Sequence, residues 1–154
     1  FDAVASLIGL RHEVTYEAQA AMELEAAASG AIEAADPRRY AFEIQSERPI
    51  KIGCKSLMRK IAQDVRRGED RHIMAVAFHH AVANMVVDVA QRLRSETGIR
   101  TVGLTGGVFQ NVLLAQLVEQ RLAEKNFATL QHQIVPPNDG GLALGQAVIA
   151  RCQL

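Results

Sequence analysis

The chain has 154 residues, the length of one ordinary domain, and about half of them are hydrophobic, which is enough to bury a core. Basic and acidic residues balance at 17 each, so the charge gives no reason to expect a nucleic-acid or membrane partner. His79, Asp88 and Gln91 interrupt the apolar stretches, which predicts no bilayer span, while Cys54 and Cys152 stand far apart, which predicts buried thiols in a reducing, cytoplasmic setting.

The first 97 residues are predicted to be mainly helical. Apolar residues recur at helical spacing in four segments: residues 1–8, 17–29, 56–67 and 71–97. Gly9, Gly30 and Gly68 mark the ends of the first three, and Ser56 and Asp70 are the predicted caps of the last two. The last segment is apolar around most of its circumference, so we expect a central helix buried on more than one side. Between these helices, alternating residues over 40–44 and 48–54 predict two short strands.

The pattern changes after residue 97 to strand, turn, helix, strand, turn, helix. Strands are predicted over 99–105 and 127–135, and helices over 111–125 and 142–152, with Asn126 as a helix stop. We therefore predict one α/β domain, in which residues 1–97 are the helical part and residues 98–154 the βαβα part. The chain begins inside a helical pattern without a Met, so we expect a piece of a longer protein.

The stretch "LTGGVFQN" places Gly106 and Gly107 between a predicted strand and a helix. Its spacing matches neither the Rossmann GxGxxG nor the P-loop, which needs a Lys-Ser/Thr pair. Two interpretations remain: a turn required by packing, or a bare backbone that aims free N–H groups at a phosphate or an adenosine. Asn111 has the same two interpretations, as a helix cap or as a contact to a ribose or base.

The second loop, "VPPNDGGLALGQA", repeats this arrangement around Asp139. Gly140 and Gly141 would permit an unusual backbone, and the carboxylate would lie near a helix N-terminus, where negative charge is favoured. Asp139 is then either a cap or a group that binds a metal or faces a phosphate. A single carboxylate does not make a metal site, so further ligands must come from elsewhere.

Together, "FDAVASLIGL", "VTYEAQAAMELEA", "LTGGVFQN" and "VPPNDGGLALGQA" resemble the C-terminal part of the HypF hydrogenase-maturation carbamoyltransferases. The likeness covers essentially the whole chain and extends more distantly to the enzymes that make threonylcarbamoyl-adenosine on tRNA. It implies the second lobe of an actin-like/Hsp70-like ATPase (ribonuclease H-like) fold. It also implies transfer of a carbamoyl group, through a carbamoyl adenylate made from carbamoyl phosphate and ATP, to the C-terminal cysteine of a HypE-like acceptor protein.

The resemblance assigns roles to residues by position. Asp2 matches an acidic residue that holds the ribose hydroxyls, and Asn111 matches an asparagine of the adenosine pocket, with Gly106 and Gly107 as the wall beneath the nucleotide. Asp139 matches a ligand of a divalent metal, iron or zinc. The family's HxxxH metal-binding pair is not in this chain, so the other ligands and the N-terminal lobe would lie outside it.

One motif departs from the family. The segment "TYEAQA" has Ala18 where the family usually has glycine, which would add strain at a positive φ, while its neighbour Glu17 keeps its predicted nucleotide contact. Adjacent His79 and His80 point about 100° apart on a helix and cannot grip one ion together, so we interpret them as core or surface histidines.

Three functions therefore remain open. The parent protein is a carbamoyltransferase whose isolated fragment is inactive, or the chain is a nucleotide-binding fragment without catalysis, or it is an interaction domain that self-associates through an exposed apolar face. No catalytic nucleophile set is visible, so the catalytic residues stay unknown, and we expect neither nucleic acid nor membrane as a partner.

Overall fold

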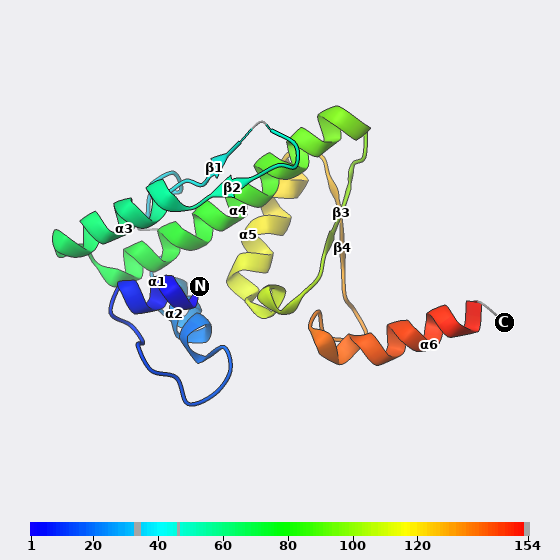
Figure 1. Cartoon of the computed structure of the whole chain (residues 1–154), viewed down its shortest axis with the longest axis horizontal. Helices are drawn as coiled ribbons and strands as arrows, with labels where there is room; N and C mark the ends of the chain where they lie inside the picture. The colour runs from blue at the N-terminus through cyan, green and yellow to red at the C-terminus, as the bar shows by residue number, and fades with distance from the viewer. Residues whose placement is uncertain (33–34, 46, 153–154) are drawn as a thin grey trace.

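The structure is a computed structural model, and it describes residues 1–32, 35–45 and 47–152. Its helices are α1 (Asp2–Leu7), α2 (Gln19–Ser29), α3 (Lys55–Arg66), α4 (Arg71–Thr97), α5 (Val112–Glu124) and α6 (Leu142–Cys152). Its strands are β1 (Glu43–Ile44), β2 (Ile52–Gly53), β3 (Thr101–Leu104) and β4 (Ala128–Gln131), and the short 3-10 turns are η2 (Gly107–Gln110) and η3 (Asp139–Gly141). The predicted order of helices and strands is confirmed (Figure 1).

Helix α4 is the centre of the molecule. Every residue from Met74 to Ala83 is buried, because α2 and α5 pack against this helix and α3 lies alongside it (Figure 1). The Asp70 side chain caps the helix by accepting from the His72 N–H at 2.7 Å, and Gly98 ends it with a φ of 77°. The expectation of a central helix buried on more than one side is therefore confirmed.

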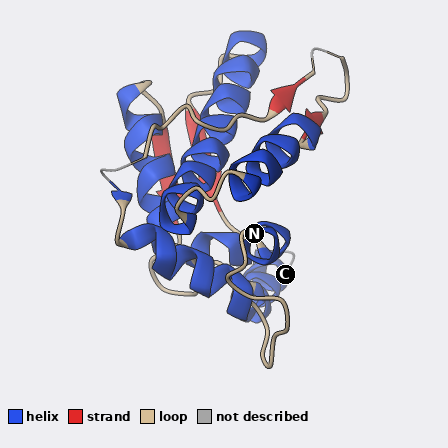
Figure 2. Cartoon of the chain, turned by 90° about the vertical axis from the view of Figure 1, so that its left-hand side faces the viewer, coloured by secondary structure: helices blue, strands red, loops and turns tan. Residues whose placement is uncertain are grey.

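The strands form two small, separate pairs between the helices (Figure 2). β1 and β2 pair antiparallel, whereas β3 and β4 pair parallel with Thr101 opposite Ala128 and Leu104 opposite Gln131. Helix α5 is the crossover between the parallel strands, so the carboxyl ends of β3 and β4 lie at the same edge. β4 stops at Gln131, four residues before the predicted end of this strand.

Helix α6 extends away from the rest of the molecule (Figure 1). All of its described residues are exposed, including Leu142 at 60% and Ile149 at 62%. The last buried residue in the described part of the chain is Phe127. Everything after β4 is thus held by local contacts and by the loop that precedes η3.

Two surface predictions were wrong. Ser56 lies inside α3, whose N-cap is Cys54, so it does not cap this helix. Both cysteines are free but exposed, because Cys54 precedes a surface helix and Cys152 lies on the projecting α6.

Helix α4 is also long and apolar enough, by length and composition alone, to cross a membrane. The prediction that interrupting polar residues exclude such a segment therefore fails for this helix. More than half of its most apolar window is buried inside the molecule, which is typical of the core helix of a globular domain.

Candidate functional site

The two glycine loops meet beyond the carboxyl ends of β3 and β4. The Gly106 N–H donates to the Pro137 carbonyl at 2.7 Å, and a Cβ placed on Gly107 would lie 4.0 Å from the Asn138 Cβ. Because the strands are parallel, their following loops emerge at one edge of the sheet, which is the usual place for ligands in α/β folds. The hydrogen bond between Gly106 and Pro137 thus joins two loops that lie about 30 residues apart in the sequence.

Gly106 requires glycine because its φ is 99°, a conformation that other residues rarely adopt. Nothing lies within 4 Å of a Cβ built there, so the backbone angle, and not crowding, selects glycine. Its N–H is occupied by Pro137, so the expectation of a free N–H fails at this position. Gly107 begins η2, and a Cβ built there would lie in ordinary contact with Gln110 and Asn138, at 3.9 Å and 4.0 Å.

Asn111 is the N-cap of α5. Its Oδ1 accepts from the Leu114 N–H at 2.8 Å, and its Nδ2 lies 2.9 Å from Nε2 of His79. The capping interpretation is confirmed, and the contact to His79 was not foreseen. One Nδ2 hydrogen is not used by these two bonds, so the side chain can still donate to a ligand.

His79 fixes the orientation of the Asn111 amide. The imidazole is fully buried in α4, and its Nδ1 lies 2.8 Å from the Ala75 carbonyl, which assigns the proton to Nδ1 and leaves Nε2 to accept from Asn111. Burial lowers the pKa of His79, which keeps the ring neutral. The prediction of a core histidine is confirmed, but nothing in the sequence indicates its bond to Asn111 at the start of α5.

Asp2 lies next in the chain to Phe1, which packs against His79. The Phe1 ring packs edge-on against His79 at a centroid distance of 5.3 Å and against Phe78 at 5.1 Å. Asp2 is exposed in the first turn of α1, next to this aromatic cluster. The structure thus places Asp2 beside the residues that hold Asn111.

Glu25 is a second residue that sequence reasoning missed. It projects from α2, and its Oε1 accepts from the Leu113 N–H at 3.1 Å, so a carboxylate faces the start of α5. The bond spans 88 positions in the sequence, and nothing in the local pattern of α2 indicates it. Together, Asn111 and Glu25 satisfy two of the backbone donors at this helix terminus.

Ala18 occupies the left-handed conformation that the motif comparison predicted. Its φ is 62°, and it stands as the N-cap of α2 without a side-chain capping bond. The adjoining loop is held by Gln19, whose Oε1 accepts from the Thr15 N–H at 2.8 Å. Glu17 is exposed, and no hydrogen bond or ion pair among the described residues ties it to the other predicted site residues.

Asp139 is exposed at the first position of η3, but it is not the cap. Asn138 takes that place, since its Oδ1 accepts from the Gly140 N–H at 3.0 Å. Gly140 and Gly141 do not have a positive φ, so the predicted unusual backbone is wrong. Close approach explains them instead, because a Cβ on either would lie 3.1–3.2 Å from its nearest neighbours in the loop.

A metal site does not form from this chain alone. Within residues 1–32, 35–45 and 47–152, no three His, Cys, Asp or Glu side chains gather closely enough to hold an ion. Among the described residues, Asp139 would therefore contribute one ligand at most.

The chain is similar to known proteins along nearly its whole length. Residues 1–146 match the family model "Carbamoyltransferase, Kae1-like Domain, second subdomain". The chain is 32% identical to the carbamoyltransferase HypF of Synechocystis over 99% of its length, and 29% identical to the probable carbamoyltransferase HypF of Methanocaldococcus jannaschii over 96%. It spans only 19% and 18% of those two proteins, about a fifth of their length.

Solved structures agree with these relatives. A crystal structure of full-length HypF in a phosphate- and nucleotide-bound form is 42% identical and covers 97% of this chain with a TM-score of 0.89. The crystal structure of HypF from T. kodakarensis is 27% identical, with a TM-score of 0.77 over the same share of the chain. This chain corresponds to 19% and 18% of those proteins.

Proposed function

Because the chain belongs to the HypF carbamoyltransferase family, we propose that it is the nucleotide-binding C-terminal part of an enzyme that transfers carbamoyl groups. In this proposal the parent protein makes a carbamoyl adenylate from carbamoyl phosphate and ATP. It passes the carbamoyl group to the C-terminal cysteine of a HypE-like protein during maturation of [NiFe] hydrogenase, in the cytoplasm. The fold would be the second lobe of an actin-like ATPase.

One observation carries the proposal: a continuous series of contacts from Phe1, the residue before Asp2, to the second glycine loop. Phe1 packs on His79, His79 holds Asn111, and η2 links Asn111 back to Gly106, which bonds to Pro137. Residues from both ends of the sequence thus converge on the N-terminus of α5. This convergence suits a contact between Asn111 and the nucleoside part of a nucleotide, since Glu25 and the Asn111 cap already occupy the Leu113 and Leu114 N–H groups at this terminus.

Each predicted residue has a distinct task in this proposal. Asp2 accepts hydrogen bonds from the ribose hydroxyls, and the unused Asn111 amide hydrogen donates to the adenosine. Gly106 and Gly107 leave a bare surface against which the nucleotide lies, because nothing lies within 4 Å of a Cβ built on Gly106 and only Gln110 and Asn138 approach one built on Gly107. These residues bind and orient the adenylate, and orientation alone contributes strongly to group transfer.

Asp139 would act together with groups outside this chain. A divalent iron or zinc ion supplies Lewis-acid chemistry when bound, and in this proposal Asp139 is one ligand while the others come from the N-terminal lobe. This chain's part is to hold the carboxylate at the start of η3, beside Asn138.

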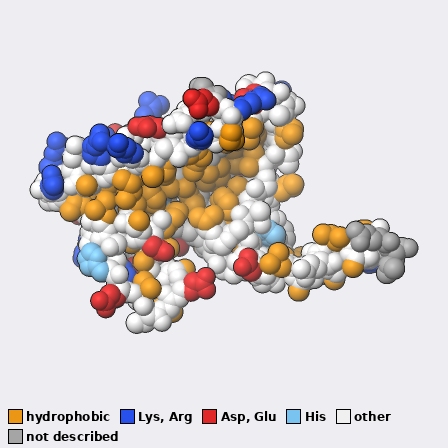
Figure 3. Space-filling view, in the orientation of Figure 1, with side chains coloured by type: hydrophobic (Ala, Val, Ile, Leu, Met, Phe, Trp, Pro, Cys, Tyr) orange, Lys and Arg blue, Asp and Glu red, His pale blue; other side chains and the backbone are white. Residues whose placement is uncertain are grey.

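The N-terminal lobe is the first partner that the surface favours. Hydrophobic side chains gather along α4 (Figure 3), and an apolar groove of about 570 Å³ runs between α4 and β3. It includes exposed Ile52, Leu93 and Ile99, and α6 adds further exposed apolar side chains. A monomer rarely leaves so much apolar surface uncovered, so we propose that the lobe covers it in the parent protein and that the isolated chain self-associates and is inactive.

The direct test is carbamoyl transfer by the parent protein carrying Asp139→Ala. We expect loss of transfer, with Glu119→Ala as a matched control because Glu119 is an exposed carboxylate on the outer face of α5. Transfer is measured by mass spectrometry of the acceptor protein. Wild-type transfer rates in the Asp139 variant would refute this assignment.

A second function is favoured by Ala18, whose left-handed backbone marks a departure from the family's glycine. In this alternative the chain binds nucleotide, or a partner, without catalysis. Calorimetry with ATP and AMP on Ala18→Gly and wild-type protein separates the two. Stronger nucleotide binding and transfer by the glycine variant favours the enzyme, whereas binding without any turnover in both favours the inactive fragment.

A further inference from the structure

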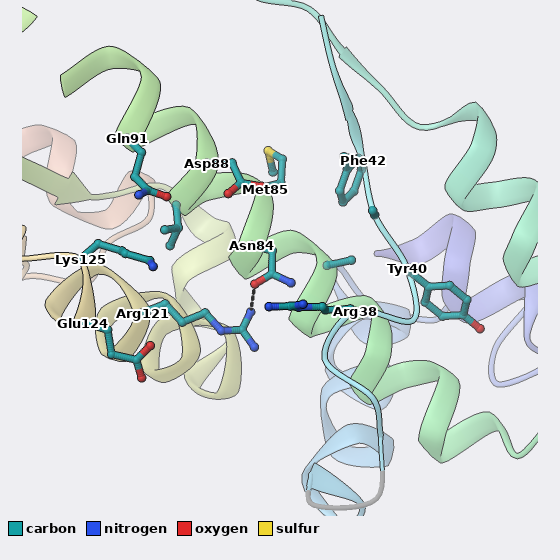
Figure 4. Close-up of a pocket in the computed structure, with 13 residues that line it drawn as sticks. Arg38, Tyr40, Phe42, Asn84, Met85, Asp88, Gln91, Arg121, Glu124 and Lys125 are labelled. Carbon is teal, nitrogen blue, oxygen red and sulfur yellow. Dashed lines mark hydrogen bonds between the residues drawn. The ribbon is translucent and has the colours of Figure 1, made fainter. Parts of the chain in front are cut away.

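A second, polar hollow lies at the opposite end of α5 from Asn111. It has a volume of about 530 Å³ and is formed by α4, the end of α5 and the loop before β1 (Figure 4). Tyr40, Phe42 and Met85 form its apolar side. The proposed nucleotide site uses none of its residues.

Arg121 is a partly buried cation in this hollow with only neutral partners. Its Nη1 donates to the His80 carbonyl and to Asn84 Oδ1, each at 2.8 Å, and its Nη2 donates to Nδ1 of His80 at 2.6 Å. Burial lowers the pKa of His80 to about 4, so the imidazole is a neutral acceptor near pH 7. No carboxylate within the described residues lies within ion-pair distance of Arg121, and Glu124 attracts this charge only at longer range.

Two further cations line the same hollow from different elements. Arg38 comes from the loop before β1 and Lys125 follows α5, and in Figure 4 both extend toward the region of Arg121 and Asn84. In the part of the chain that the structure describes, neither side chain forms an ion pair. Arg121 and Lys125 lie one turn apart at the end of α5 and Arg38 comes from a separate loop, so three like charges line one hollow and repel one another, and an anion between them would relieve this repulsion.

Among the described residues, the acidic side chains of the hollow form no ion pair with these cations, although Glu124 attracts Arg121 at longer range. Glu124 accepts from Gln120 at 3.1 Å on the surface of α5, and in Figure 4 its carboxylate points away from Asn84. Asp88 lies on α4 one turn after Asn84 and is exposed. Asp88 therefore limits the affinity for an anion without pairing with Arg121.

We propose that this hollow binds the oxyanion group of a small molecule, a phosphate or a carboxylate, through Arg38, Arg121 and Lys125. The guanidinium groups match the geometry of either oxyanion, and Lys125 adds a flexible positive charge. Asn84 orients Arg121, because its Nδ2 is itself fixed by the Pro37 carbonyl at 3.0 Å. The apolar side of the hollow leaves room for the remainder of the ligand.

A purely structural role explains Arg121 alone, since its bonds tie α5 to α4. It does not explain why Arg38 and Lys125, which make no such bonds with their side chains, line the same hollow. It also gives Asp88 no effect on anion binding. The two explanations therefore differ in what charge changes at Arg38, Lys125 and Asp88 do.

The test is calorimetric titration of the complete parent protein with inorganic phosphate and, separately, with acetate. Arg38→Gln and Lys125→Gln should each weaken binding about two- to fivefold, because each removes one partly screened attraction. Asp88→Asn should tighten binding by a similar factor, since it removes a repulsion. Arg59→Gln is the matched control, an exposed arginine on α3 outside the hollow, and should leave binding unchanged.

Stronger binding of phosphate than of acetate assigns a phosphate ligand, and the reverse assigns a carboxylate. No binding of either ion overturns the proposal. So does binding that Arg38→Gln and Lys125→Gln affect no more than Arg59→Gln, because the ion then lies elsewhere on the protein. Weaker binding in Asp88→Asn would also contradict it.

Discussion

The two halves of the chain differ in how far they bury their apolar side chains and pair their polar groups. Residues 1–97 bury α4 and hold their polar groups in internal pairs, such as Asp64 with Arg39 and Tyr40, each at 2.9 Å. The half after residue 97 buries one face of α5 and little else, and α6 contacts mainly its own η3 turn. The second half, which carries the predicted ligand loops, therefore depends on surfaces that the first half does not provide.

This difference separates stability from function. The helical half is a support that positions Asn111 through His79 and α5 through Glu25, whereas the loops after β3 and β4 remain exposed. Substitutions in the first half should mainly change the free energy of unfolding. Substitutions in the loops and α6 should mainly change what the parent protein binds.

The largest effect is expected from Asp64→Ala. The change removes the acceptor shared by Arg39 and the fully buried Tyr40 hydroxyl, and it leaves a partly buried guanidinium with only Glu69 at 3.0 Å. We expect the free energy of unfolding to fall by about 3 kcal/mol, measured by urea denaturation. Glu119→Ala, which removes an exposed carboxylate, should change it by less than about 0.5 kcal/mol. Similar values for both variants would show that the first half is not held by this cluster.

The next effect is a loss of stability in mild acid. The pKa values of His79 and His80 are lowered in the folded state, that of His80 to about 4, from an ordinary value of 6.5, because both rings are buried. The unfolded chain thus binds more protons than the folded one in this range of pH. The free energy of unfolding therefore has its full value above about pH 6.5 and falls as the pH drops toward 4. We expect a loss on the order of 2 kcal/mol in this window.

Urea denaturation at a series of pH values measures this loss. His80→Gln should flatten the profile, because glutamine can still accept from Arg121 but does not titrate in this range. His12→Gln is the control, since His12 is exposed and bonds only to Ser6. An unchanged slope in the His80 variant would mean that other groups cause the acid sensitivity.

Local patterns were sufficient to predict most of the fold. Helical periodicity located the six helices of the described residues, and Asp70 and Asn126 lie at the predicted helix ends because their backbone or capping chemistry is local. What failed depended on how the elements pack: Cys54 is exposed because it precedes a surface helix, and Cys152 is exposed because α6 projects from the other described elements.

The site shows the same division. The motifs identified Asn111, Gly106 and the left-handed Ala18, since a helix cap and a positive φ favour particular residue types that can be recognised in the local sequence. His79 and Glu25 were missed, because their bonds to Asn111 and Leu113 join α4 and α2 to α5 across long intervals. Only the packing of three helices reveals which residues hold the site in place.

A smaller effect is expected where the two halves join. Asn111→Ala removes the cap to Leu114 and leaves Nε2 of buried His79 without its donor, so we expect a loss of about 1–2 kcal/mol. Asn111→Asp keeps the cap and should lose less. Neither variant can donate to His79, so thermal unfolding of the two measures the contribution of the cap to Leu114, and equal losses would mean that this cap contributes nothing to stability.

The smallest effect on the chain itself is expected from Val148→Ala in α6. Val148 is 53% exposed, and an 11-residue helix without packing is only marginally stable in water, so the substitution should change stability by less than about 0.5 kcal/mol. The matched change Val118→Ala, at a fully buried position of α5, should cost about 2 kcal/mol. In the complete parent protein the two substitutions should become similar, because the N-terminal lobe would then cover α6. If Val148→Ala stays without effect there, as judged by thermal unfolding, α6 remains exposed in the parent and the second half does not depend on that lobe for its packing.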